Sequence, residues 1–261
     1  MKPERHAPLV VGVVHLPPLP GAPRATLPLD AIVAAAVRDA VAYRDGGASA
    51  VIVENFGDAP FLKGPVEPHT VAAMALAVRE VAAAVPLPIG VNVLRNDAPA
   101  AIGIAAMTGA SFVRVNVHTG AMVTDQGVLE GRADLSLRYR RQLGAPVEIW
   151  ADLMVKHGVP LGDQSLEDVA RDAVERGLAD AVIVTGAATG RPALPDDVRR
   201  VRLVLPDTPI YIGSGVSAAN ATAFLPAATG FIVGTWAKVD GRIENPVDPN
   251  RVRRLVDAVG G

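Results

Sequence analysis

Short apolar segments alternate along the chain with longer, alanine-rich segments whose apolar residues recur at helical spacing. The short segments have the length of strands, and glycine or proline follows several of the longer ones, where a helix would end. The predicted strands are residues 9–16, 50–55, 89–94, 112–118, 147–153, 181–185, 210–214 and 231–235. The predicted helices include residues 30–45, 69–85, 98–108, 134–143, 165–176 and 195–205. About eight successive strand–helix units are typical of a (β/α)8 barrel.

Two central strands carry polar side chains on one face only. With the two-residue period of a strand, residues 112–118 place Arg114, Asn116 and His118 on one face and valines on the other. Residues 147–152 repeat this pattern, with Glu148 and Asp152 on the polar face. An open doubly wound sheet would also alternate strands and helices, but the first strand lacks the G-x-G-x-x-G turn, and polar residues end nearly every strand. We therefore predict an α/β fold, a single TIM-barrel domain over residues 1–261.

Composition excludes several classes of function. The chain of 261 residues has a formal net charge of −2, so no basic surface predicts nucleic-acid binding. It has no cysteine, which excludes disulfides, a thiolate nucleophile and thiolate metal sites. The apolar run near the N-terminus is broken by His15 and prolines, and it is too short to span a membrane. We expect a cytoplasmic protein without membrane insertion.

In a barrel, the carboxyl ends of the strands meet at one mouth, where active sites lie. The expected acid–base or oxyanion-stabilising residues there are His118, Asp152, Lys156, Glu54, Asn92 and Asn116. Because His118 and Asp152 end adjacent predicted strands, we expect them to share a hydrogen bond that orients the imidazole; the alternative is a structural histidine. Lys156 would bind an anion or act as a Schiff-base amine. Arg114 and Glu148, one layer deeper, are expected to form a structural ion pair.

No cofactor is certain from the sequence. A divalent metal is one alternative, held by His15, His118, Asp152 and His157, although no local spacing of ligands supports it.

Glycines after the last two predicted strands indicate an anion site. Gly213, Ser214 and Gly215 end the seventh strand, with a helix expected near Ser217, and Gly234 and Thr235 end the eighth. Phosphate-binding barrels use the loops at these two positions, because glycine lets backbone N–H groups approach an anion. Gly186, after the sixth strand, would line the same pocket. The alternative is that these glycines only form tight turns.

Two connections are unusually long. Residues 119–133 contain three glycines and several charged side chains, and they would suit a lid over the substrate. Residues 56–68 could form the opposite wall, or either segment could be an oligomer contact, because Phe56 and Phe61 need cover. We expect a homo-oligomer.

Five long motifs resemble the BtpA family, which includes SgcQ-type proteins. They are GVVHLPPLPGAP (residues 12–23), VENFGDAPF (53–61), GVNVLRNDA (90–98), FVRVNVHTGAMVTDQGVLEGRA (112–133) and ADLMVKHG (151–158). The similarity continues to the GSGV and VGTW segments and covers nearly the whole chain. It implies a TIM barrel of the ribulose-phosphate-binding kind, a link to photosystem I biogenesis for the member that gives the family its name, and sugar metabolism for others. The resemblance does not say which residue is catalytic.

Two functions therefore stay open. The first is an enzyme that acts on a small phosphorylated metabolite, such as a sugar phosphate, by proton transfer, as an isomerase, epimerase or lyase. The second is a non-enzymatic assembly or stability factor of the photosystem I biogenesis type. The concentration of polar side chains at one end of the barrel favours the enzyme, because a scaffold does not need it.

Overall fold

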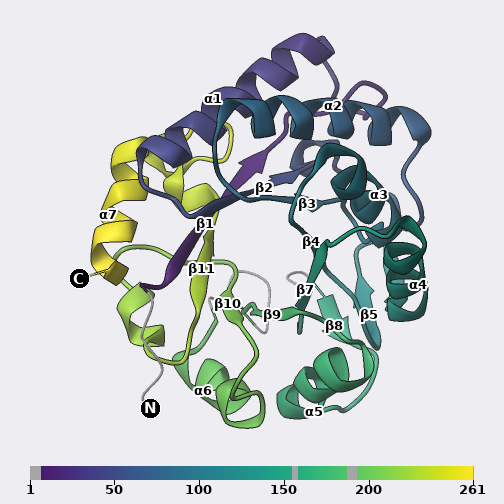
Figure 1. Ribbon diagram of the computed structural model, residues 1–261, viewed down its shortest axis with the longest axis vertical. Helices are drawn as coiled ribbons and strands as arrows, with labels where there is room; N and C mark the ends of the chain where they lie inside the picture. Colours follow the sequence, from purple (N-terminus) through teal and green to yellow (C-terminus); the bar gives the residue numbers. More distant parts are fainter. Residues whose placement is uncertain (1–6, 155–157, 187–192, 261) are drawn as a thin grey trace.

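The computed structural model describes residues 7–154, 158–186 and 193–260. Eight parallel strands close into a barrel in the order β1–β11–β10–β9–β7–β4–β3–β2, with β2 again paired to β1 (Figure 1). These strands are β1 (Leu9–His15), β2 (Ala50–Glu54), β3 (Ile89–Asn92), β4 (Phe112–Val115), β7 (Glu148–Asp152), β9 (Ala181–Val184), β10 (Ile210–Ile212) and β11 (Gly230–Val233). The predicted (β/α)8 architecture is confirmed.

Helices ring the outside of the barrel (Figure 1). They are α1 (Leu29–Asp45), α2 (Pro68–Ala84), α3 (Ala98–Thr108), α4 (Ala133–Leu143), α5 (Leu166–Arg171), α6 (Pro195–Val204) and α7 (Pro249–Gly260). A π-helical turn, η2 (Asp172–Arg176), continues α5. No helix in the described ranges is long and apolar enough to cross a bilayer.

The connection predicted as a lid contains regular secondary structure. Residues 119–133 contain a β-hairpin of β5 (Ala121–Thr124) and β6 (Gly127–Glu130), and β8 (Gly158–Pro160) adds to β5 to give a three-stranded antiparallel sheet. Met122 and Leu129 on one face are buried with Val117 of the barrel rim. The hairpin is therefore held to the barrel by its own apolar contacts.

The helix expected near Ser217 is also absent. A turn at residues 217–220 leads into η3 (Ala221–Phe224), a single 3-10 turn. The segment after β11 begins in the same way, with the 3-10 turn η4 (Thr235–Ala237). The two predicted anion loops are thus followed by tight turns, not by long helices.

A stack of three aromatic rings fills the barrel interior. Trp150 lies between Phe112, with ring centroids 3.8 Å apart, and Tyr211, with centroids 4.0 Å apart, and both pairs are nearly parallel. Gly90 makes room for the first of these rings, because a Cβ there would lie 2.2 Å from Phe112 Cε2. The stack closes the interior below the next layer of inward side chains, which begins with Arg114.

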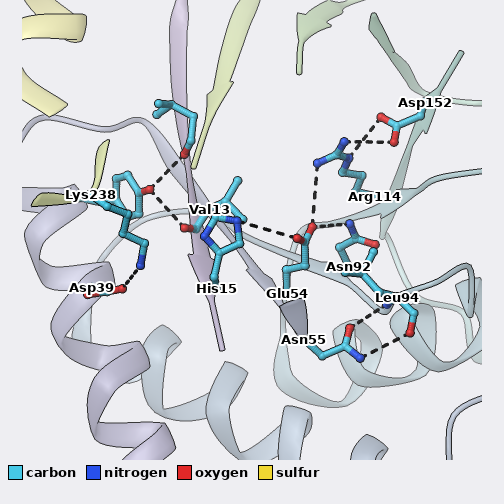
Figure 2. Close-up of polar contacts among 12 residues, drawn as sticks. Val13, His15, Asp39, Glu54, Asn55, Asn92, Leu94, Arg114, Asp152 and Lys238 are labelled. Carbon is cyan, nitrogen blue, oxygen red and sulfur yellow. Dashed lines mark hydrogen bonds and ion pairs between the residues drawn. The ribbon is translucent and has the colours of Figure 1, made fainter. Parts of the chain in front are cut away.

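Helix α1 fastens the strands at which the barrel closes. The Tyr43 hydroxyl lies 3.2 Å from the carbonyl oxygen of Val13 in β1 and 3.0 Å from that of Val233 in β11. Nearby, the buried Lys238 Nζ lies 2.5 Å from Asp39 Oδ2 (Figure 2), and the other oxygen of this carboxylate accepts the Val247 N–H. These contacts join α1 to the segment after β11.

Candidate functional site

A cluster of buried polar side chains lies at the carboxyl ends of β1 to β4 and β7. Six of them form one continuous set of contacts: His15, Glu54, Asn92, Arg114, Asn116 and Asp152. Figure 2 shows five of these residues, all but Asn116. Adjacent parallel strands bring these positions together, as the register pairs His15 with Glu54 and Glu54 with Asn92. The cluster confirms the prediction that polar strand ends meet at one mouth.

Arg114 and Asp152 form a two-pronged ion pair in the cluster. Arg114 Nε and Nη2 donate to the two carboxylate oxygens of Asp152 at 3.2 and 3.1 Å, and Asn116 Nδ2 donates to Oδ2 at 2.7 Å. The Asp152 side chain is fully buried, and that of Arg114 is 12% exposed. Burial lowers the pKa of Arg114, but the nearby carboxylates of Asp152 and Glu54 outweigh this effect and hold the pKa above its ordinary value. Arg114 is therefore a fixed cation at the mouth.

Glu54 is the carboxyl group of the cluster that lines the large cavity. Asn92 Nδ2 donates to its Oε2 at 2.6 Å, and Arg114 Nη1 lies 4.0 Å from the same oxygen. Its other oxygen lies 3.9 Å from His15 Nε2. Burial raises the pKa of Glu54, and the nearby Arg114 and Asn92 offset only part of this effect. A carboxyl group with a raised pKa is suited to exchanging a proton near neutral pH.

A cavity of about 910 Å³ opens at this end of the barrel. Polar side chains that line it include His15, Glu54, Arg95, Arg114, Asn116 and Asp125. Asp125 comes from the turn of the β5–β6 hairpin, so the added sheet contributes to the wall. The Oδ1 atom of Asn116 is buried without a hydrogen-bond partner among the described residues, which leaves an acceptor for a ligand at the cavity.

The predicted anion loops form the other side of the same cavity, through Ser214 and Gly215 after β10 and Gly234 and Thr235 after β11. Ser214 and Gly215 have φ values of 68° and 70°, a left-handed conformation that a serine adopts rarely. Gly213 lies behind this turn, since a Cβ there would come within 2.9 Å of Ile183 Cγ2. The structure thus brings the loops after β10 and β11 to the same cavity as Glu54.

His118 does not join the cluster, and this corrects the expected hydrogen bond to Asp152. Its Nε2 lies 2.8 Å from the carbonyl oxygen of Gly177, at the end of η2, and the side chain is buried toward the outer helices. Asp152 is bonded to Arg114 and Asn116 instead. Burial lowers the pKa of His118, with the Gly177 carbonyl opposing this effect. Burial therefore favours the neutral form of the ring, which lies away from the cavity.

The ion pair expected between Arg114 and Glu148 is also corrected. Glu148 is exposed at the start of β7 and accepts a hydrogen bond from Trp150 Nε1 at 2.9 Å. Arg114 extends in the opposite direction, toward the mouth. Sequence reasoning placed both residues on the inward face but treated Arg114 as a structural residue. The guanidinium group of Arg114 lies closer to the mouth of the barrel than the position of its Cα indicates.

The remaining predicted residues divide by position. Lys156 and His157 lie outside the described residues, as do residues 187–192, which follow Gly186. Gly186 itself is buried after β9. Among the residues that the structure describes, no group of three His, Asp or Glu side chains is arranged to hold a metal ion. Of the four expected ligands, His15 and Asp152 belong to the polar cluster and His118 does not.

Comparisons with known proteins cover nearly the whole chain. The sequence model of the BtpA family matches residues 5–261. The photosystem I biogenesis protein BtpA of Synechocystis sp. is 46% identical over 250 residues, which are 96% of this chain and 87% of that protein. An uncharacterized protein of Thermococcus kodakarensis is 47% identical over 248 residues, 95% of this chain and 94% of that one.

Solved structures share the fold at low sequence identity. N-(5′-phosphoribosyl)anthranilate isomerase from Pyrococcus furiosus aligns over 97% of this chain and 98% of its own, with a TM-score of 0.58 and 14% identity. At that identity, the similarity concerns the barrel fold alone.

Proposed function

Because this chain belongs to the BtpA family and folds as a TIM barrel, we propose that it is an enzyme that acts on a sugar phosphate by acid–base chemistry. The reaction class would be isomerisation, epimerisation or carbon–carbon cleavage next to a carbonyl group. The observation that carries the proposal is the position of Glu54. It is a buried carboxyl group with a raised pKa, and it shares one cavity with the glycine-containing loops after β10 and β11.

Each group at the cavity has a chemical task in this proposal. The backbone N–H groups around Ser214, Gly215 and Gly234 would bind the phosphate. Glu54 would take a proton from the carbon beside the substrate carbonyl and return it to another atom. Arg114 and the Asn116 side chain would stabilise the negative charge that develops on the carbonyl oxygen. Asp152 would hold both of these residues in place through its three hydrogen bonds.

His118 is left out of the proposed proton transfer, because its ring contacts Gly177 and the residues that line the cavity do not include it. The solved neighbour supports the substrate class only by analogy: its name describes an isomerase of a phosphoribosyl compound, on the same fold.

Deuterium incorporation tests the proposal directly. The protein is incubated in D2O with a panel of aldose and ketose phosphates, and NMR follows exchange at the carbon next to the carbonyl as well as any new product. We expect exchange or turnover with at least one compound, and a loss of about 10²- to 10⁴-fold in Glu54→Gln. Glu148→Gln is the matched control, because it changes a carboxylate of the same barrel at its opposite end. No exchange, no turnover and no thermal stabilisation by any phosphate would refute the proposal.

A second function is favoured by one finding, the 46% identity to a photosystem I biogenesis protein. In that case the chain would act through its surface, as an assembly or stability factor. Expression of wild type and Glu54→Gln in a cyanobacterium that lacks its own BtpA separates the two: an assembly factor would restore photosystem I content in both forms, whereas an enzyme would do so only in the wild type.

A further inference from the structure

An aromatic pair, an exposed Phe56 and a half-buried Phe61, forms part of the cavity wall, and the proposed phosphate and proton-transfer groups do not account for it. Phe56 follows β2 in the 3-10 turn η1 (Phe56–Asp58), lines the cavity and is 41% exposed. Phe61 lies beside it, with ring centroids 6.5 Å apart, and lines the same cavity. An aromatic side chain left open to solvent loses favourable burial, so an exposed ring inside a pocket points to a ligand that covers it.

The turn that carries Phe56 is held in place by hydrogen bonds and close packing. Asp58 accepts hydrogen bonds from the Leu19 N–H at 2.8 Å and from Asn55 Nδ2 at 3.0 Å. Asn55 Oδ1 in turn accepts from the Leu94 N–H at 2.7 Å. Gly57 lies against the segment that follows β1, because a Cβ there would be 2.3 Å from the backbone nitrogen of Pro18. The ring is thus presented by a rigid turn, which is how a binding surface is preorganised.

His15 separates the Phe56 ring from the predicted anion loops after β10 and β11. Going around the rim, β10, β11, β1 and β2 are neighbours, so His15 lies between the anion loops and Phe56. Its ring contacts both sides: the centroid is 4.8 Å from that of Phe56, and a Cβ on Gly234 would be 2.6 Å from His15 Cε1. A ligand held at Gly234 must therefore extend over His15 and past Glu54 to reach Phe56.

The size of the cavity fits such an extended ligand. At about 910 Å³ it lies near the upper end of the range of roughly 300–1,000 Å³ that drug-sized ligands occupy. Trp236 also lines it, but the Arg251 guanidinium lies 4.9 Å above the Trp236 ring. Phe56 and Phe61 are therefore the aromatic surface best placed to receive a flat group.

We propose that the substrate is a phosphorylated sugar that carries a planar aromatic or heteroaromatic ring, with its phosphate at Ser214 and Gly215 and its ring against Phe56. This inference rests on the proposed function, because it uses the same phosphate position and adds a ring site to it. Between the two ends, the sugar carbons would lie beside Glu54.

Binding of a matched ligand set tests the ring site. Calorimetric titration compares four ligands. Ribose 5-phosphate carries the phosphate without a ring, adenosine carries the ring without a phosphate, and adenosine 5′-monophosphate and uridine 5′-monophosphate carry both. We expect at least one of the two nucleotides to bind about tenfold or more tighter than ribose 5-phosphate, since stacking of one base on an aromatic side chain contributes on this scale. Phe56→Ala should remove most of this gain and leave ribose 5-phosphate binding unchanged, whereas Gly215→Val should weaken every phosphate.

The variants and ligands keep the two proposals separable. Phe56→Leu keeps an apolar side chain but removes the flat ring face, so it should weaken nucleotide binding without the loss of folding that a larger change could cause. Leu203→Ala, an exposed apolar residue on α6, is the control that should alter nothing. If both nucleotides bind no tighter than ribose 5-phosphate, or if the gain persists in Phe56→Ala, the ring site is refuted while the proposed function stands. If no phosphate binds, or if Gly215→Val weakens the binding of none of them, both proposals fail.

Discussion

Replacing Asp152 with asparagine should destabilise the protein strongly, because it leaves Arg114 as a buried cation without its carboxylate. Removing one partner of a buried ion pair costs about 3–5 kcal/mol. The Asp152 side chain is fully buried and accepts three hydrogen bonds, two from Arg114 and one from Asn116. Glu54 Oε2, 4.0 Å from Arg114 Nη1, keeps some negative charge nearby. We therefore expect the lower end of the range, about 3 kcal/mol.

Equilibrium unfolding in urea, followed by tryptophan fluorescence, measures this loss, because Trp150 lies in the aromatic stack below Arg114. With a urea dependence of about 3 kcal/mol per molar, the midpoint should fall by about 1 M. The double variant Asp152→Leu with Arg114→Met removes both charges and should lose less stability than Asp152→Asn.

The matched control for this prediction is Asp134→Asn, which breaks the Arg132–Asp134 ion pair, where both side chains are more than half exposed. It should leave the midpoint unchanged. A fall for Asp152→Asn no larger than the fall for this control would show that the buried contacts do not hold the mouth together, and the reasoning would be refuted.

Three further predictions concern stability. Ser214→Gly should raise the free energy of unfolding by about 1 kcal/mol, because glycine adopts the left-handed φ of 68° without steric cost. An unchanged denaturation midpoint would mean that Ser214 does not have this left-handed conformation. Tyr43→Phe should lower the free energy of unfolding by about 1 kcal/mol, because it removes the hydroxyl contact to the carbonyl oxygens of Val13 and Val233. The same measurement checks it, and no loss of stability would mean that this contact is not made. Burial holds the pKa of folded His118 below its ordinary value of 6.5, so the contribution of His118 to stability is complete above pH 6.5 and declines as the pH falls toward the folded pKa. His118→Gln should therefore flatten the dependence of the free energy of unfolding on pH. An equal slope in the variant and the wild type would contradict this prediction.

Strand periodicity identified most of the site, and it failed where the strand ended. Arg114 and Asn116 point inward as the alternation of residues 112–118 predicts. The regular pairing of β4 with β7 stops at Val115, however, so the two-residue period no longer applies at His118. Its ring points to the outer helices for this reason. The same pattern could not show how far the Arg114 side chain reaches.

The added sheet was missed for a different reason. Its hairpin signal is present in the sequence, where Asp125, Gln126 and Gly127 stand between two short apolar segments, and Gly127 takes a positive φ in the structure. Its third strand, β8, comes from beyond β7, and such pairing between distant segments leaves no periodic signal in either one. The glycine loops after β10 and β11 were predictable from their place in the strand order, whereas the missing helix after β10 was not.

The junction of β1 and β11 has a consequence for synthesis and for shortened forms of the chain. Leu9 pairs with Gly230, so during synthesis β1 keeps one unpaired edge until β11 has emerged from the ribosome. The Tyr43 hydroxyl likewise finds only one of its two carbonyl groups until Val233 arrives. A protein that stopped before β11 would expose two strand edges, on β1 and β10, and would be prone to aggregate through them.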